Sequence, residues 1–164
     1  MVSVEFFTVP TIRFQVLYVF LVLAHDRRRI LHFNVTRHPT AEWTVQQLRE
    51  AFPFEQVPRY LLRDRDSIFG GEFREGVKAM GMKEVLSAPR SPWQRAYVER
   101  VIGTIRRECL DHVIVFNEAL LHRHVKSSWR IITNPEITYR WKRIPQKPAH
   151  CKRLMRAGSL RSRR

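Results

Sequence analysis

The apolar run over residues 14–24 constrains the fold more than any other stretch of this chain. Gln15 is its only strongly polar side chain. The run is too short to cross a bilayer, because a membrane-spanning helix needs about 20 apolar residues. It also follows no basic segment of the kind that opens a signal peptide. We therefore expect residues 14–23 to form a central strand that is covered on both faces.

Two more strands are predicted beside this run. Residues 1–9 are rich in β-branched and aromatic side chains, and Pro10 ends that segment. Residues 30–36 alternate loosely between apolar and polar side chains, after a charged turn at residues 26–29. Three consecutive strands with short connections predict an antiparallel meander.

After the meander, helices and strands alternate. Thr40 is a predicted N-cap, and Gly81 is predicted to end a later helix in the left-handed conformation that glycine tolerates. The first helix has an inward stripe at helical spacing, made of Trp43, Gln47, Leu48 and Ala51. We predict strands over residues 59–63 and 83–86, and helices over residues 72–80, 93–110 and 117–126. The order is thus β-β-β-α-β-α-β-α-α, an α/β arrangement with five strands.

Two carboxylates fall where this arrangement can bring them together. A short apolar strand, residues 60–62, delivers Asp64 to its end, and a later helix carries Glu99, 35 positions on. A strand end and a later helix can converge over one spot. Two or three converging carboxylates with open coordination positions provide what Mg²⁺ needs for phosphoryl transfer.

Longer motifs surround both carboxylates. They are Asp64-x-x-x-x-Phe69, Gly81-Met82-Lys83, the run SPWQRAYVER over residues 91–100 and the run GTIRRE over residues 103–108. Together they resemble the integrase-type catalytic core of DDE transposases, a family that includes insertion-sequence transposases and retroviral integrases. The resemblance covers residues 1–126. It implies an RNase H-like fold, a five-stranded mixed sheet with helices on both faces.

The resemblance also implies a catalytic and metal-binding set of three carboxylates. Glu5 stands on the first strand where the family has Asp, and its extra methylene displaces the oxygens by about 1 Å, an error that can lower the rate about 10²-fold. Asp64 is the second ligand because its spacing to Phe69 fits the family motif. Asp66 is the alternative, since residues two apart on a strand share a face. Glu99 is the third ligand, and the metal is Mg²⁺, with Mn²⁺ as a substitute.

DNA is the expected partner. Arg106 lies seven residues after Glu99, so it projects from nearly the same helix face and can bind a phosphate. Arg95 and Arg100 are weaker candidates for phosphate contacts, and Trp93 is a candidate for stacking on bases. For Trp43 we favour core packing over base stacking. Family members act as multimers that join two DNA ends, so the resemblance implies a homo-oligomer on DNA.

The basic charge is concentrated at the C-terminal end. The chain carries a net charge of +15, which attracts polyanions such as nucleic acid. Residues 128–164 hold eleven basic residues and one acid, Glu136, for a net +10, which leaves +5 for residues 1–127. We interpret residues 127–164 as a basic tail that is irregular or read out of frame, with disorder from Pro145 onward.

The two cysteines, Cys109 and Cys151, suggest no disulfide framework and fit a reducing compartment. Cys109 lies near His112, His122 and His124, but their spacing matches no common zinc pattern. We expect a cytoplasmic protein of bacterial type that associates with the nucleoid and has no membrane segment.

Three functions follow from these features. The first is DNA transposition and integration, in which a DDE-type core performs metal-dependent DNA end cleavage and strand transfer, here in a truncated copy. The second is a catalytically inactive remnant that only binds DNA. It is favoured by Glu5, by the odd tail and by the few residues ahead of Glu5, where family members carry a helix-turn-helix domain. The third, an RNase H-like nuclease acting on RNA–DNA hybrids, is disfavoured by the transposase-like run over residues 91–108.

Overall fold

The computed structural model describes residues 1–25, 29–53, 57–87 and 92–132, and for residues 92–95, 97 and 130–132 it describes the backbone only. The elements are β1 (Val2–Pro10), β2 (Val16–Ala24), β3 (Arg29–Thr36), α1 (Ala41–Ala51), β4 (Tyr60–Arg63), α2 (Gly71–Ala79), β5 (Lys83–Leu86), α3 (Pro92–Glu108), a short 3₁₀ turn (Leu110–His112) and α4 (Glu118–Ile132). The predicted basic tail from residue 133 onward lies outside the described residues.

One sheet of five strands organises the molecule, in the order β3-β2-β1-β4-β5. The first three strands form the predicted antiparallel meander, whereas β1 pairs with β4, and β4 with β5, in parallel. β1 therefore lies in the middle. β2, the predicted central strand, lies beside it and is paired along both edges.

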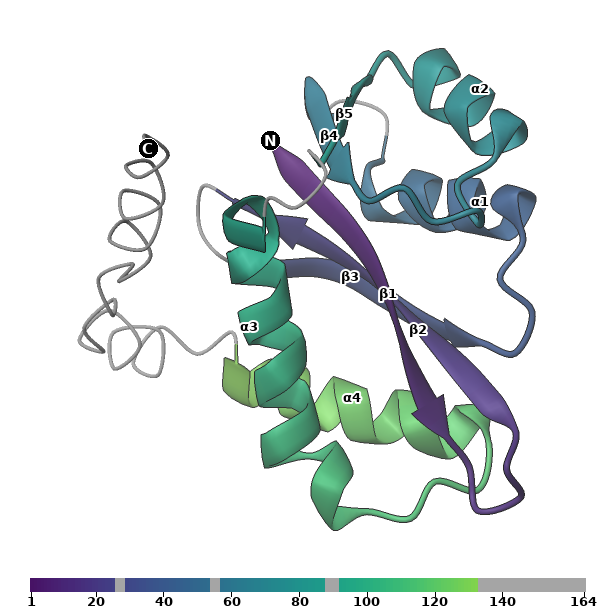
Figure 1. Cartoon of the computed structure of the whole chain (residues 1–164), viewed down its shortest axis with the longest axis vertical. Helices are drawn as coiled ribbons and strands as arrows, with labels where there is room; N and C mark the ends of the chain where they lie inside the picture. The colour runs from purple at the N-terminus through teal and green to yellow at the C-terminus, as the bar shows by residue number, and fades with distance from the viewer. Residues whose placement is uncertain (26–28, 54–56, 88–91, 133–164) are drawn as a thin grey trace, which may run out of the picture. The chain divides into compact units, whose positions relative to one another are not determined.

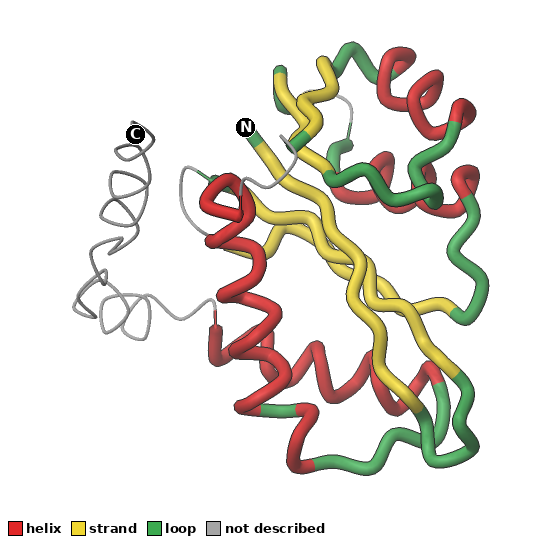
Figure 2. The backbone as a smooth tube through the Cα atoms, viewed as in Figure 1, coloured by secondary structure: helices red, strands yellow, loops and turns green. Residues whose placement is uncertain are grey.

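Helices cover both faces of the sheet (Figures 1 and 2). On one face, α1 and α2 pack through Val45, Leu48, Phe73 and Val77 onto Val2, Val4, Phe20 and Val22. On the other, α3 and α4 pack through Val98, Val101, Ile105, Leu121 and Val125 onto Phe7, Val9, Leu17, Val19 and Phe33. β1 and β2 alternate between the two cores because successive strand side chains point to opposite faces. The predicted five-stranded mixed sheet with helices on both faces is confirmed.

The predicted helix ends follow from local chemistry. Thr40 Oγ1 accepts a hydrogen bond from the Trp43 N–H at 3.1 Å, and Asn117 Oδ1 accepts one from the Leu120 N–H at 2.9 Å. Both side chains satisfy amides that have no partner inside their helices. Gly81, with φ of +75°, follows α2 in the left-handed conformation.

Several boundaries differ from the sequence prediction by one or two residues, and the end of α4 differs by six. β2 begins at Val16 rather than at residue 14, because residues 11–15 make the turn that joins it to β1. α4 continues to Ile132 instead of ending near Lys126. Its inward stripe explains the extension, since Leu121, Val125 and Ser128 are all buried at helical spacing.

Trp43 contributes to the core under α1, as predicted. Its ring is half-buried and lies 6.4 Å from the Phe6 ring and 6.2 Å from the Phe20 ring. Within the described residues, no helix is both long enough and apolar enough to cross a membrane.

Two helical glycines are predicted to respond oppositely to alanine. A Cβ at Gly76 would lie 2.5 and 2.7 Å from the two methyl carbons of Val45, whereas a Cβ at Gly103 would meet no described atom within 4 Å outside its own helix. Gly103→Ala should raise the free energy of unfolding by about 0.5–1 kcal/mol by removing backbone freedom. Gly76→Ala should lower it by about 1–3 kcal/mol through overpacking. Urea unfolding of the two variants checks this, and equal shifts would refute the close contact between α1 and α2.

Candidate active site

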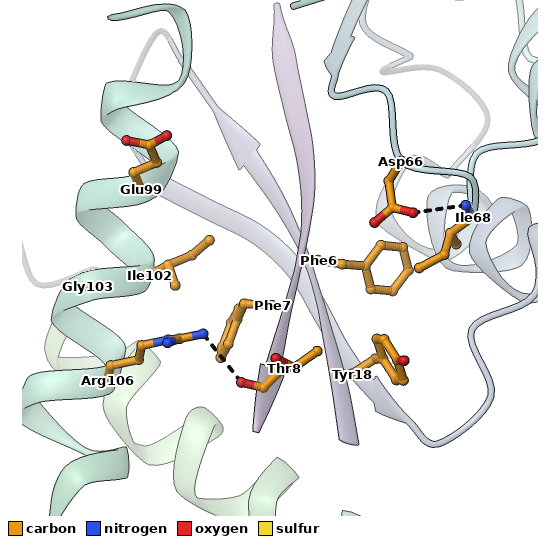
Figure 3. Close-up of a pocket in the computed structure, with 10 residues that line it drawn as sticks. All are labelled: Phe6, Phe7, Thr8, Tyr18, Asp66, Ile68, Glu99, Ile102, Gly103 and Arg106. Atoms are coloured by element: carbon orange, nitrogen blue, oxygen red, sulfur yellow. Dashed lines mark hydrogen bonds between the residues drawn. The ribbon is translucent and has the colours of Figure 1, made fainter. Parts of the chain in front are cut away.

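An opening of about 470 Å³ lies between the β1–β2 ladder and α3. Figure 3 shows α3 along one side, β1 between, and the loop after β4 on the other side. The lining residues are Phe6, Phe7, Thr8, Tyr18, Asp66, Ile68, Glu99, Ile102, Gly103 and Arg106. Two carboxylates and one guanidinium thus surround a single opening that is lined largely by aromatic and aliphatic side chains.

One face of α3 supplies four of these residues. Glu99, Ile102, Gly103 and Arg106 recur at the spacing that places side chains on one side of a helix. The adjoining face buries Val98, Val101 and Ile105 against the sheet. Burial of that apolar face fixes the rotation of the helix, and the rotation turns Glu99 and Arg106 toward the opening, as the sequence predicted.

Arg106 connects the lower part of α3 to the end of β1 (Figure 3). Its guanidinium donates a hydrogen bond to the Thr8 carbonyl oxygen at 3.4 Å and lies 5.7 Å from the centre of the Phe7 ring. The side chain remains exposed. A cation is therefore held at the rim of the opening, where it can also meet an anion from solvent.

Glu5 lies on the strand in the middle of the sheet and is only 7% exposed. It shares its strand face with Phe7 and Val9, which belong to the core under α3 and α4. Glu5 therefore faces the helix layer that carries Glu99. Its burial on a central strand distinguishes Glu5 from an exposed charge on an edge strand.

The parallel pairing of β1 with β4 relates Glu5 to the acids after β4. Val2 pairs with Leu61 and Ser3 with Leu62. Two positions further along, the same register would set Asp64 opposite Glu5, but the described pairing ends at Ser3 and Leu62. Asp66 follows Asp64 by two residues. β4 ends at Arg63, so both aspartates lie in the segment that leaves the sheet.

Asp64 and Asp66 differ in their surroundings. Asp66 lines the opening, and its Oδ1 accepts hydrogen bonds from the Ile68 N–H at 3.1 Å and from the Ser67 hydroxyl at 3.4 Å. Asp64 is less exposed, and its Oδ1 accepts the Asp66 N–H at 3.0 Å. Both aspartates therefore stabilise the turn after β4. An extension of the β1–β4 register favours Asp64 as the second acid of the site, whereas Asp66 is the one that lines the opening.

Glu99 and Glu5 lie on two elements that pack against each other. α3 and β1 share one core, and the Arg106 guanidinium donates to the Thr8 carbonyl oxygen near the end of β1. Glu99 is seven helical residues before Arg106, about 10 Å along α3. Glu5 is three strand residues before Thr8, about 10 Å along β1.

The donor set is made of carboxylates, and oxygen ligands of this kind fit Mg²⁺. In the described part of the chain, no three acidic, histidine or cysteine side chains come close enough together to hold a metal ion. The assignment of Glu5, Asp64 and Glu99 as a metal set therefore stays a prediction that rests on the family resemblance of their positions.

Arg63 anchors the turn that carries both aspartates. It is 4% exposed, forms a double hydrogen bond with the Glu84 carboxylate at 3.1 and 3.3 Å, and donates to the Asp64 carbonyl oxygen at 2.8 Å. Its guanidinium also lies 5.3 Å from the centre of the Phe69 ring. The pair joins β4 to β5 and holds the backbone of Asp64 where the strand ends.

Cys109 and His122 take part in core packing, whereas His112 is exposed. Cys109 is buried, and its Sγ donates to the His124 carbonyl oxygen at 3.5 Å. His122 stacks on Phe33 with ring centres 4.8 Å apart. Burial lowers the pKa of His122, and Lys126 and His32 lower it further, so the neutral ring is favoured.

Of the other residues that were predicted to contact DNA, only the Arg100 side chain is described by the structure. Arg100 is exposed on α3 but is not part of the lining. The side chains of Trp93 and Arg95 lie outside the described residues. Thr8 and Tyr18 were not predicted as site residues, although they pair across β1 and β2 and complete the opening. Their place in the lining depends on the register between the two strands, which cannot be read from the sequence.

A family model described as an integrase core domain matches residues 80–134, which include Glu99 and all of α3. The match extends beyond residue 126, where the sequence analysis placed the end of the resemblance. No curated protein sequence matches the chain.

Solved integrase structures share the fold. One is the simian T-cell lymphotropic virus intasome in complex with PP2A regulatory subunit B56 gamma, with a TM-score of 0.61 and 12% identity. Another is the HTLV-2 integrase catalytic core domain in complex with magnesium (trimeric form), with a TM-score of 0.53 and 14% identity. The described part of the chain thus has the RNase H-like fold of these integrase cores. The BIV integrase catalytic core domain also resembles this core, with a TM-score of 0.50 and 12% identity.

The alignment with the simian virus chain covers 76% of this chain and 46% of that one. The alignment with HTLV-2 integrase covers 64% of this chain and 65% of that one, and the alignment with BIV integrase covers 63% and 66%. The integrase-type core thus spans less than two thirds of each solved chain. At these identities the likeness concerns the fold, and the chemistry must be argued from the residues described above.

Glu84→Gln is predicted to destabilise the integrase-type core by about 1–3 kcal/mol, because it leaves the buried Arg63 guanidinium without an ionised partner. Glu108→Gln is the matched control. It also removes an ion pair with an arginine, Arg107, but those two side chains are 71% and 64% exposed, and such pairs contribute about 0–1 kcal/mol. Urea unfolding at neutral pH measures both. Equal effects would show that Arg63 does not depend on Glu84.

Proposed function

We propose that this chain is the catalytic core of a DDE-type transposase, which cleaves DNA ends and transfers the freed strand to target DNA. The observation that carries the proposal is the opening beside β1, where Glu99 and Arg106 from one face of α3 lie with Asp66 from the loop after β4. Glu5 lies on β1 on the face that packs under α3, and Asp64 follows directly after β4, the strand that pairs with β1. Glu5, Asp64 and Glu99 stand at the acidic positions of the family that the sequence resembles.

Glu5, Asp64 and Glu99 would hold Mg²⁺, with Asp66 as the alternative to Asp64. The metal, when bound, supplies activation of the attacking hydroxyl or water and stabilisation of the leaving oxygen. The protein's own part is to position the acids on rigid elements. Glu5 is fixed by the central strand, Asp64 by the Arg63 anchor, and Glu99 by the apolar face of α3.

The rim of the opening suits a polymeric anion. Arg106 is held at one side, and a Cβ at Gly103 would meet no described atom within 4 Å beyond its own helix. A phosphate backbone could approach α3 closely at the glycine and be bound by the arginine. Integration joins two DNA ends, so the active form of this mobile-element protein would be a homo-oligomer on DNA.

Glu5 supports a second candidate function, a catalytically inactive remnant of a transposase that only binds DNA. Glutamate is one methylene longer than the aspartate of the family, and Mg²⁺ requires near-ideal geometry at short distances. A copy with a longer first acid could keep the fold and the DNA affinity while losing the reaction.

A strand-transfer assay separates the two functions. The full chain and its Glu5→Asp variant are incubated with element-end DNA and either Mg²⁺ or Mn²⁺, and joined products are measured. We expect Glu5→Asp to raise product formation about 10²-fold, because an error of about 1 Å at a reacting centre has an effect of that size. Asp64→Asn and Glu99→Gln in the Glu5→Asp background should abolish joining.

Asp111→Asn, which changes an exposed acid outside the opening, is the control and should leave joining unchanged. Asp66→Asn should retain activity if Asp64 is the ligand. Joining that survives loss of Glu99 would refute the carboxylate set. Folded protein that binds DNA but joins none in any variant would support the inactive remnant.

Arg106→Gln is predicted to weaken DNA binding in a salt-dependent way. Loss of one phosphate contact should reduce the slope of log affinity against log salt concentration by about one. Arg107→Gln is the control, because its side chain is exposed beside Glu108 and does not line the opening. Fluorescence anisotropy with duplex DNA at several salt concentrations gives both slopes, and equal slopes would remove Arg106 from the DNA contact.

A further inference from the structure

Exposed apolar side chains gather at the tip of the β1–β2 hairpin. Two segments meet there, because the Ile12 N–H donates to the Val115 carbonyl oxygen at 2.9 Å. Figure 1 shows the hairpin turn beside the segment that leads into α4. The exposed side chains are Ile12, Phe14, Val16, Ile114 and Phe116. We call this set the tip patch.

Phe14 is the most exposed member, at 94%. Its φ of 58° is in the left-handed region, which is unusual for a bulky residue and is strained by about 1–3 kcal/mol. The turn enforces this conformation. The Phe14 N–H donates to the Thr11 carbonyl oxygen at 2.9 Å, and the Thr11 N–H donates to the Gln15 carbonyl oxygen at 2.8 Å. The ring is therefore projected into solvent by a rigid turn.

The charge around the tip patch is positive. Arg13 is exposed next to Phe14. The sequence has no acid between Glu5 and Asp26, and none between Asp111 and Glu118. An exposed aromatic ring beside an exposed arginine suits nucleic acid, since the ring can stack on a base and the guanidinium can bind the adjoining phosphate.

The tip continues the strands that line the opening. Thr8 and Tyr18 pair across β1 and β2 and belong to the lining. Glu5 and Thr11 are six residues apart, which corresponds to about 20 Å along an extended strand. A single strand with stacked bases covers this distance in about six nucleotides at 3.4 Å each. A DNA end that reacts at the opening could thus extend along the hairpin to its tip.

From these observations we propose that the tip patch binds unpaired bases of the DNA end, with Phe14 stacking on a base and Arg13 contacting the neighbouring phosphate. The site rests on the proposed function for its choice of DNA. Apolar side chains of other DNA-binding proteins insert between base steps and partly unstack them.

The test measures binding of the full chain to two fluorescent DNAs by anisotropy, with no strand transfer required. One is a blunt duplex, and the other is the same duplex with a single-stranded extension of about ten nucleotides. Phe14→Gly removes the ring and suits the left-handed backbone, so the variant should fold at least as well as the parent. Phe14→Trp keeps a stacking ring. Val85→Ala, at an exposed apolar residue of β5, is the control.

We expect Phe14→Gly to weaken binding of the extended DNA about 10-fold, within the range measured for loss of one stacked base. Blunt-duplex binding should change less than about 2-fold, and Phe14→Trp and Val85→Ala should bind both DNAs as the parent does. Arg13→Gln should also weaken binding of the extended DNA.

Other outcomes overturn the proposal in distinguishable ways. If Phe14→Gly binds both DNAs like the parent, the tip patch makes no base contact, while the proposed function is untouched. If it instead reduces self-association in sedimentation without affecting DNA binding, the patch is a protein interface. If the parent binds neither DNA, the inference fails together with the function on which it rests.

Discussion

The parallel pairing between β1 and β4 is the constraint on which the candidate site depends. It places Glu5 on the middle strand, next to the strand that leads into Asp64 and Asp66. β1 pairs with β4 only through Ser3 and Leu62, and β4 ends at Arg63, so both aspartates lie beyond the ladder. The anchor between Arg63 and Glu84 stabilises this branching point, because a buried guanidinium needs an ionised, hydrogen-bonded partner. The position of Asp64 thus depends on the ion pair between Arg63 of β4 and Glu84 of β5.

The second constraint is the amphipathic character of α3. Its apolar face packs on the sheet and leaves little freedom for rotation, so the polar face must point to the opening. One helix thereby performs two tasks: it completes a core and presents Glu99 and Arg106 in fixed positions. Gly103 adds a place of close approach between them, at a cost in helix stability of about 0.5–1 kcal/mol relative to alanine.

The helices and strands could be predicted well from the sequence, because hydrophobic periodicity, helix caps and helix-breaking residues are local signals. Thr40, Gly81 and Asn117 end or begin helices where their chemistry requires. The burial of Glu5 was not predictable, since it follows from the central place of β1, and strand order depends on contacts between distant segments. The same holds for the choice between Asp64 and Asp66, which depends on where pairing ends. Phe14 was predicted to begin an apolar strand, but the turn over residues 11–15 keeps it out of the core and exposes its ring.

Under the proposed function, Glu5 is the residue at which the fold and the chemistry make different demands. A side chain that is 7% exposed in the middle of a sheet must fit its surroundings, and a carboxylate there loses most of its hydration. The fold accepts a glutamate at this position, since β1 keeps its full register with β2 around it. Metal-assisted phosphoryl transfer is more demanding, because a displacement of about 1 Å is enough to slow a reaction about 10²-fold. An active core and an inactive one can therefore share every element described here and differ by one methylene group on the central strand.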